Sequence, residues 1–140
     1  IVGFPGETEA DFNELKAFVE WYEFDRVGVF EFSPEEGTGA AELPDQVPDE
    51  VKAERFDTLM QIQQMISYRN NTLQVSEILE VMIDNYSESK NRSFGRTQGD
   101  AYSVDQTVIV KGKYNAGTIY PVRITRASEY DLYGEVTDER

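Results

Sequence analysis

The first eight residues constrain the fold more than any other part of this chain. Ile1-Val2 is typical of the end of a buried strand, and the turn Gly3–Gly6 leads directly into a helix that begins near Thr8. A strand that ends in a glycine- and proline-containing turn and continues into a helix is typical of the C-terminal rim of an α/β unit, where ligands bind. Because the chain opens inside such a unit and lacks an initiator methionine, we expect it to be the tail of a larger enzyme.

The absence of cysteine and histidine from all 140 residues excludes several kinds of chemistry. Without cysteine there can be no disulfide, no cysteine nucleophile and no thiolate ligand for zinc or iron–sulfur clusters within these residues. Without histidine the commonest general base and metal ligand is missing. We therefore predict no catalytic residue and no metal ligand here. No apolar run reaches the roughly 18 residues of a membrane span, so we expect no membrane partner.

The net charge of −14 is unevenly distributed. Residues 1–69 contain 16 acidic against 5 basic residues, whereas residues 70–140 contain 11 against 8. The first part should repel a polyanion, and the second could bind one only through a local patch, because nucleic-acid binding requires phosphate neutralisation by Lys and Arg. A strongly acidic body favours a basic protein as partner. The alternative is that the charge serves solubility alone.

Helical and extended patterns alternate in the first half of the chain. A helix is predicted from Thr8 to the region of Tyr22–Asp25, and its buried side is marked by Phe12, Leu15, Val19 and Tyr22. Residues 26–32 then form an apolar run typical of a parallel strand that is covered on both faces. A longer helix is predicted from Pro48 to about Asn70, with a buried side of Phe56, Leu59, Ile62 and Ile66.

After Asn70 the apolar residues alternate with a period of two, as in Leu79, Val81 and Ile83. Four further strand-like runs follow at residues 93–97, 107–110, 119–125 and 131–136. Five short strands without a helical pattern between them predict a small antiparallel barrel of the OB-like type, with residues 113–117 as a hairpin loop. The whole chain is therefore expected to be of the α+β class.

Three segments carry motifs that can be compared with known families. In chain order they are Gly3-Phe4-Pro5-Gly6-Glu7-Thr8, Ser33-Pro34-Glu35-Glu36-Gly37-Thr38 and Glu129-Tyr130-Asp131-Leu132-Tyr133-Gly134-Glu135-Val136. Together they resemble the radical S-adenosylmethionine methylthiotransferases, and the resemblance covers nearly the whole chain. The third segment, together with residues 95–97 and 122–125, is similar to the RimO branch of that family.

The resemblance implies an architecture and an activity. Residues 1–43 would be the last βαβ step of a TIM-like radical SAM partial barrel, residues 44–70 a linking helix, and residues 71–140 a TRAM domain. The intact, cytoplasmic enzyme would hold two 4Fe-4S clusters and S-adenosylmethionine, and would methylthiolate the β-carbon of an aspartate in the small-subunit ribosomal protein S-twelve. This fragment is expected to bind none of these cofactors and to be inactive alone.

The resemblance also implies site residues. Gly3, Phe4, Gly6 and Glu7 would form part of the S-adenosylmethionine rim, although the glycines could serve only the turn and Glu7 could be solvated. The predicted substrate-binding residues are Arg96, Arg123, Tyr130 and Tyr133. Further candidates on the same domain are Tyr102, Lys111, Lys113 and Arg126, with complementary acidic charge from Asp100, Asp105, Glu129 and Asp131.

Two alternative functions remain open from the sequence. The first is a transfer-RNA adenosine methylthiotransferase of the MiaB type, and the second is a stand-alone RNA- or protein-binding OB-like module. We favour the ribosomal protein because residues 70–140 carry a balance of only −3 and close on the RimO-like segment. The barrel strands of residues 1–43 would lack neighbours in this chain. We therefore expect either self-association through their exposed edges or poor order in these residues.

Overall fold

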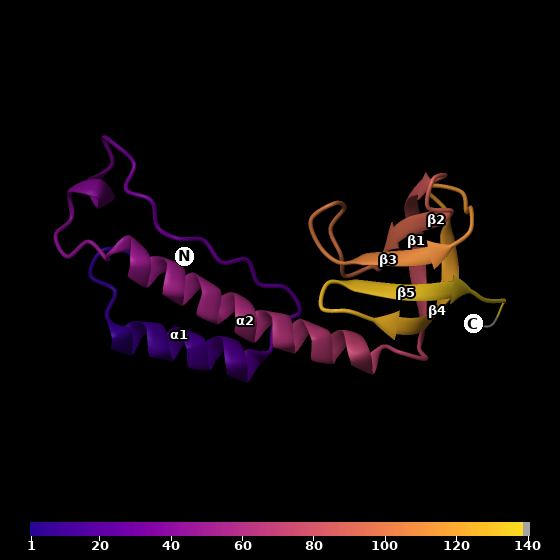
Figure 1. The fold of residues 1–140 in the computed structure, drawn as a ribbon, viewed down its shortest axis with the longest axis horizontal. Coiled ribbons are helices and arrows are strands. Elements are labelled where there is room, and N and C mark those ends of the chain that lie inside the picture. Colours follow the sequence, from indigo (N-terminus) through magenta and orange to yellow (C-terminus); the bar gives the residue numbers. More distant parts are fainter. Residues whose placement is uncertain (139–140) are drawn as a thin grey trace. The chain divides into compact units, whose positions relative to one another are not determined.

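The computed structural model describes residues 1–138, and the chain divides into two compact units, residues 1–66 and the residues from 67 onward. The first unit contains α1, a short 3-10 helix η1 and most of α2, and the second contains five strands (Figure 1). This composition confirms the α+β class. The elements are α1 (Glu9–Tyr22), η1 (Gly39–Glu42), α2 (Asp49–Leu73), β1 (Ile78–Ser87), β2 (Arg92–Arg96), β3 (Thr107–Lys111), β4 (Ile119–Ala127) and β5 (Asp131–Val136).

Helix α1 begins at a capping box, at the position where the sequence predicts its start. The Thr8 hydroxyl accepts a hydrogen bond from the Asp11 backbone N–H at 3.2 Å, and the Asp11 carboxylate accepts one from the Thr8 N–H at 2.8 Å. The hydrogen bond from the Thr8 side chain, followed by that from its backbone, lowers the pKa of Asp11 below its ordinary value. The helix ends where Glu23 adopts a left-handed conformation with φ of 49°.

The two extended segments of the first unit run parallel, as predicted, but they form only one bridge, between Val2 and Glu31. The Val2 N–H donates to the Phe30 carbonyl at 2.8 Å, and the Phe32 N–H donates to the Val2 carbonyl at 2.8 Å. The prediction of a regular strand over residues 26–32 is therefore wrong. Val29 is buried but Phe30 is 68% exposed, so only one face of this segment is covered among residues 1–138.

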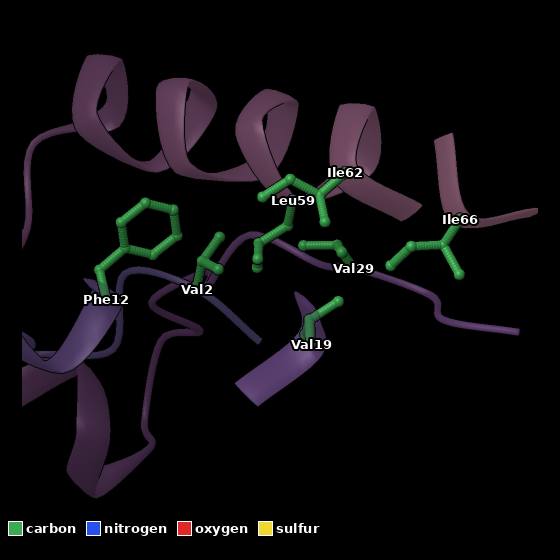
Figure 2. Close-up of a cluster of buried hydrophobic side chains, with 7 residues drawn as sticks. All are labelled: Val2, Phe12, Val19, Val29, Leu59, Ile62 and Ile66. Atoms are coloured by element: carbon green, nitrogen blue, oxygen red, sulfur yellow. The ribbon is translucent and has the colours of Figure 1, made fainter. Parts of the chain in front are cut away.

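A hydrophobic core holds the first unit together, and Figure 2 shows side chains from both helices and both extended segments pointing into it. The predicted buried sides of α1 and α2 are confirmed except at Tyr22, which is 59% exposed. Tyr22 is the last helical residue, so it lies next to the turn at Glu23 rather than over the core. The core consists of Val2, Phe12, Val19, Val29, Leu59, Ile62 and Ile66, with Leu15 and Phe56 packed against it.

The second unit is a closed barrel with the strand order β1-β2-β3-β5-β4. This confirms the predicted five-stranded OB-like barrel, with one difference in the direction of its pairs. Four pairs are antiparallel, and β3 pairs with β5 in parallel, as in the register Val108 to Leu132. Strict alternation cannot close a ring with an odd number of strands, so at least one parallel pair is required.

The connection between β3 and β4 does not form the hairpin that the sequence suggests at residues 113–117. Strand β4 pairs with β1 and β5 but not with β3, so this loop crosses over to a non-adjacent strand. The local turn residues were read correctly as a loop, but the pairing of the flanking strands depends on the whole barrel. Within residues 1–138 the antiparallel pairs of consecutive strands are β1–β2, β2–β3 and β4–β5.

Two glycines let the barrel strands approach closely. A Cβ at Gly95 would lie 2.5 Å from the Met82 carbonyl oxygen, and one at Gly134 would overlap the Val122 side chain. Glycines in strand interiors commonly mark such close approaches of the backbone. The core that they enclose consists of Val81, Ile83, Val108, Val110, Val122, Ile124 and Leu132, each at most 1% exposed.

Candidate cofactor rim and substrate-facing surface

The predicted cofactor rim is a tight turn whose two glycines differ in what lies beside them. Both have positive φ, 75° at Gly3 and 85° at Gly6, a conformation that favours glycine. The space that a Cβ of Gly3 would occupy is filled by the buried Lys52 side chain, whereas nothing lies within 4 Å of that position at Gly6. A ligand could therefore come close to the backbone at Gly6, whereas the Lys52 side chain blocks such an approach at Gly3.

Glu7 is engaged within the protein. Its carboxylate accepts hydrogen bonds from the Gly3 N–H at 3.1 Å and from Arg55 Nη1 at 2.6 Å. Arg55 is 5% exposed, and its guanidinium also lies 3.5 Å from a Glu9 carboxylate oxygen and 5.4 Å from the centre of the Phe12 ring. These contacts tie α2 to the turn, so Glu7 has a structural role that the sequence-based alternative of a solvated side chain missed.

Phe4 is the predicted rim residue with the greatest freedom to meet a ligand. Its ring is 46% exposed and packs edge-on against Phe32, with the ring centres 5.2 Å apart. Phe32 comes from the neighbouring extended segment, so the two rings line the same rim. The contact of Gly3, Phe4, Gly6 and Glu7 with S-adenosylmethionine stays a prediction.

Tyr133 and Arg126 form a close cation–π pair on the outer surface of the barrel. They are direct partners in the β4–β5 register, and the Arg126 guanidinium carbon lies 3.6 Å from the centre of the Tyr133 ring. In register across the barrel, Tyr133 is next to Ile109 on β3, and Ile109 is next to Phe94 on β2. These three half-buried side chains form an apolar row with a cation at one end.

Arg96 lies on β2, in a cavity of about 330 Å³ on the barrel surface. Its Nε donates to the Asp84 carboxylate at 3.2 Å, and its guanidinium lies 5.8 Å from the centre of the Tyr102 ring. The β2–β3 loop, including the predicted candidate Asp105, forms the other wall of this cavity. The sequence analysis did not predict Asp84, because a register shift between Ile83 and Asn85 interrupts the alternation there.

Arg123 and Tyr130 are placed differently from the other two predicted substrate residues. Arg123 Nη1 donates to the Ser76 carbonyl at 3.2 Å, and the residue is opposite Glu135 in register, so it stabilises the barrel. Tyr130 is 59% exposed in the β4–β5 turn. The predicted set Arg96, Arg123, Tyr130 and Tyr133 is thus distributed over β2, β4, β5 and a turn, and its role in substrate binding stays a prediction.

The end of α2 holds the β4–β5 turn by its backbone. Ser67 Oγ donates to the Glu129 carbonyl at 2.7 Å, and Asn71 Nδ2 donates to the Ser128 carbonyl at 2.9 Å. Two residues of segment 129–136 also serve the fold, because Leu132 lies in the barrel core and Gly134 allows close approach to β4. Desolvation by burial raises the pKa of Asp131 in the same segment.

The remaining predicted candidates lie in loops or at strand ends. Asp100 is buried and accepts a hydrogen bond from Thr97 Oγ1 at 2.6 Å, which orders the β2–β3 loop. Lys111 and Lys113 are exposed at the end of β3. Within residues 1–138 no cluster of three or more His, Cys, Asp or Glu could hold a metal ion, and no helix there is long and apolar enough to cross a membrane.

Comparison with known proteins identifies relatives of both units. Residues 75–137 match the TRAM domain family. The chain is 51% identical over 134 residues to a ribosomal protein uS12 methylthiotransferase RimO from Thermosynechococcus vestitus, which covers 96% of this chain and 30% of that protein. RimO proteins from a Nostoc species and from Syntrophotalea carbinolica are 51% and 50% identical, and the match covers 97% and 99% of this chain. The chain spans about 30% of the length of these relatives.

Proposed function

We infer that this chain, which belongs to the RimO family of methylthiotransferases, forms part of an enzyme that methylthiolates the β-carbon of an aspartate in ribosomal protein uS12. Its own contribution is substrate recognition by the TRAM barrel and part of the cofactor rim by the turn Gly3–Gly6. The observation that carries this proposal is the identity of about 50% to RimO proteins over 96–99% of the chain. That identity spans both units and includes the segments that carry the resemblance to the RimO branch.

The charge of the chain supports a protein substrate that is rich in lysine and arginine. A protein that resides among ribosomal RNA must neutralise phosphates and therefore carries many cations. The net charge of −14 complements such a partner and would assist its association. Tyr133, with the Arg126 guanidinium over its ring, offers a flat surface whose N–H groups can donate to peptide carbonyls.

The residues present fit one of the two cofactors implied by the family. Iron–sulfur clusters require thiolate ligands, and none of the 140 residues is a cysteine, so the cluster ligands would have to come from other parts of the parent protein. S-adenosylmethionine, when bound, supplies the methyl group and the radical chemistry. The open side of Gly6 and the exposed face of Phe4 would receive its adenosyl part, while the Glu7–Arg55 pair holds the turn in shape.

The test uses the full-length enzyme that contains this chain, with purified uS12 and bulk transfer RNA as alternative substrates. Mass spectrometry of the products should detect a methylthiolated aspartate in uS12 and no modified adenosine in the RNA. The double variant Y133A/R126Q should raise the KM for uS12 and change kcat little, because these residues would bind substrate and take no part in the chemistry. The matched control is Y68A, which removes an exposed tyrosine from α2. Modification of transfer RNA instead of uS12 would contradict the proposal.

A further inference from the structure

A buried lysine lies beside the turn Gly3–Gly6, and its ion pair does not account for its burial. Lys52 is 4% exposed, although lysine is rarely buried to this degree unless it is well paired. Its Nζ donates to the Asp49 carboxylate at 3.0 Å, but the Asp49 side chain is 94% exposed. An ion pair with so exposed a partner contributes little to stability. Another contact must therefore favour the charge of Lys52.

The position of Lys52 in α2 also disfavours a cation. Lys52 is the fourth residue of this helix, close to the N-terminus, where the helix dipole favours anions such as Asp49 and Glu50. An apolar side chain of similar length would fill the same space without the cost of desolvating an ammonium group. Burial and the helix dipole both oppose the charge, so packing alone does not explain it.

Arg55, one turn later in α2, is a buried cation whose charge the fold does explain. Arg55 is 5% exposed and bonds to Glu7, whose side chain is 13% exposed, so the two charges are buried together. That pair holds the turn to the helix. Among residues 1–138, no buried carboxylate is paired with Lys52 in the same way.

The contacts of Lys52 lead to the two aromatic rings of the rim. Its aliphatic stem lies against the backbone of Gly3, the residue immediately before Phe4. Its ammonium group lies 5.8 Å from the centre of the Phe32 ring. The Phe32 ring in turn meets Phe4 at an angle of 70°, with the ring centres 5.2 Å apart. Lys52 therefore contacts both the backbone that precedes Phe4 and the ring that packs against it.

Each contact in this row orients the next side chain. A cation is attracted to the face of an aromatic ring, and two rings favour an edge-on arrangement over a face-to-face sandwich. The ammonium group over Phe32 therefore favours one orientation of that ring, and the edge-on contact passes this preference to Phe4. The backbone of Phe32 is already held, because its N–H donates to the Val2 carbonyl at 2.8 Å.

We propose that Lys52 is a positioning residue for S-adenosylmethionine, acting through Phe32 on the Phe4 ring that would receive the adenosyl part. This role rests on the proposed function, in which the turn Gly3–Gly6 forms part of the cofactor rim. Because Lys52 is buried and Phe4 is 46% exposed, Lys52 acts on the orientation of the rings and Phe4 meets the ligand. A ring that is held in place before binding lowers the cost of ordering the site.

The first experiment measures the affinity for S-adenosylmethionine by isothermal titration calorimetry, with the full-length enzyme that contains this chain and its reconstituted clusters. K52M keeps an unbranched stem but removes the charge, and it should weaken binding about three- to tenfold. K52R keeps a cation and should restore most of the affinity. The matched control K90M removes a barrel lysine that lies 5.9 Å from the centre of the Phe94 ring, and it should bind normally. Equal affinity of K52M and the unmodified enzyme would overturn the proposal.

Chemical denaturation of the 140-residue chain separates positioning from a role in the fold. Replacement of a buried charge by an apolar side chain of similar volume is often neutral or stabilising. K52M should therefore be at least as stable as the unmodified chain, although the same substitution weakens cofactor binding in the full-length enzyme. If K52M is less stable than K90M, Lys52 serves the fold and the proposal is wrong.

A double-mutant cycle tests the route through Phe32. F32L removes the ring, so K52M in the F32L background should change the affinity for S-adenosylmethionine no further. Losses that add would show that Lys52 acts by another route, contrary to the proposal. This cycle also uses K52R, which should match the unmodified enzyme only while Phe32 is present.

A spectroscopic measurement needs no cofactor. The 140-residue chain is labelled with fluorophenylalanine, and the fluorine NMR signal of Phe4 is assigned with F4L. This signal should shift in K52M and stay in place in K90M, and an unchanged Phe4 signal in K52M would contradict the proposal. Failure of the unmodified full-length enzyme to bind S-adenosylmethionine would overturn the proposed cofactor rim together with the role of Lys52. Normal binding by both the unmodified enzyme and K52M would count against Lys52 alone.

Discussion

The two units of this chain bury hydrophobic cores of similar size but differ in how completely they satisfy their backbone and cover their apolar side chains. Each of the five barrel strands pairs with two neighbours, so the sheet has no open edge. The first unit has one bridge, between Val2 and Glu31, within the described residues. In the closed barrel every strand has a hydrogen-bonded neighbour on both sides, whereas the extended segments of the first unit leave hydrogen-bonding edges free.

The first unit also exposes large apolar side chains that its own core does not use. Phe18, Tyr22 and Phe24 contact one another at the end of α1, with ring centres 4.6–5.7 Å apart, and each is at least 39% exposed. Trp21 is 83% exposed and Phe30 is 68% exposed. Exposed apolar groups at this density commonly mark a surface that another polypeptide covers. Both units therefore form a hydrophobic core, but only the first unit exposes an apolar surface of the kind that another polypeptide commonly covers.

The largest expected effect concerns the association state of the 140-residue chain. We expect self-association through the first unit, and the variant W21K/F30K should shift the chain from mainly oligomer to mainly monomer, because it replaces two exposed apolar groups with charges. Sedimentation velocity over a range of concentrations would measure this. The control Y102K changes an aromatic residue of the barrel that is 58% exposed, and should have no such effect. A monodisperse monomer before any substitution would refute the expectation.

The next effect concerns the barrel core. Leu132 is fully buried, so Leu132→Ala should destabilise the barrel by about 2 to 5 kcal/mol through lost burial and the cavity that remains. Amide hydrogen exchange should show reduced protection in the barrel strands and unchanged protection in α1. The conservative Leu132→Met should cost less than about 1.5 kcal/mol. Equal loss of protection in α1 would mean that the two units unfold together.

A somewhat smaller effect is expected at the ion pair that ties α2 to the cofactor-rim turn. Arg55→Met preserves much of the apolar contact with Phe12 but leaves the nearly buried Glu7 carboxylate without its cation. We expect a loss of about 3 kcal/mol, confined to the first unit, in chemical denaturation followed by hydrogen exchange. The double variant E7Q/R55M should recover part of this loss. If the double variant is no more stable than R55M, the charge of Glu7 is not the cause.

The smallest effect is expected at the start of α1. Thr8→Ala removes the N-cap and should cost about 1 kcal/mol. The hydrogen bonds from the Thr8 side chain and backbone also lower the pKa of Asp11 in the folded state, so the stabilisation by the Asp11 carboxylate is present above the ordinary pKa of 3.8 and is lost as pH falls through the lowered value. Thermal unfolding from pH 7 to pH 2 should therefore depend less on pH in the variant. An unchanged pH profile would contradict this account of Asp11.

Local patterns predicted the helices and the five strands, because each depends on residues within one or two turns or strand repeats. Thr8 and Asp11 mark a helix start by their spacing, and the alternation of Leu79, Val81 and Ile83 marks a strand with one buried face. The parallel β3–β5 pair and the crossover after β3 could not be predicted in this way. They follow from closure of the whole barrel and not from the turn residues themselves.

The site was less predictable than the fold because its contacts join distant parts of the sequence. Glu7 is bound by Arg55, 48 positions later, so nothing next to Glu7 reveals its structural role. Tyr133 was predicted from the resemblance to the RimO branch, but its partner Arg126 depends on the irregular register of β4 with β5.

The strand order of the barrel, β1-β2-β3-β5-β4, has a consequence for the sequence of steps by which the barrel assembles. Strands β1, β2 and β3 pair with their neighbours in sequence, as do β4 and β5, so these two groups can form early through local contacts. The seams β1–β4 and β3–β5 join distant segments and bear the cost of closing long loops. We expect these seams to form last. If the same order holds in reverse, these two seams are also where the native barrel would open first.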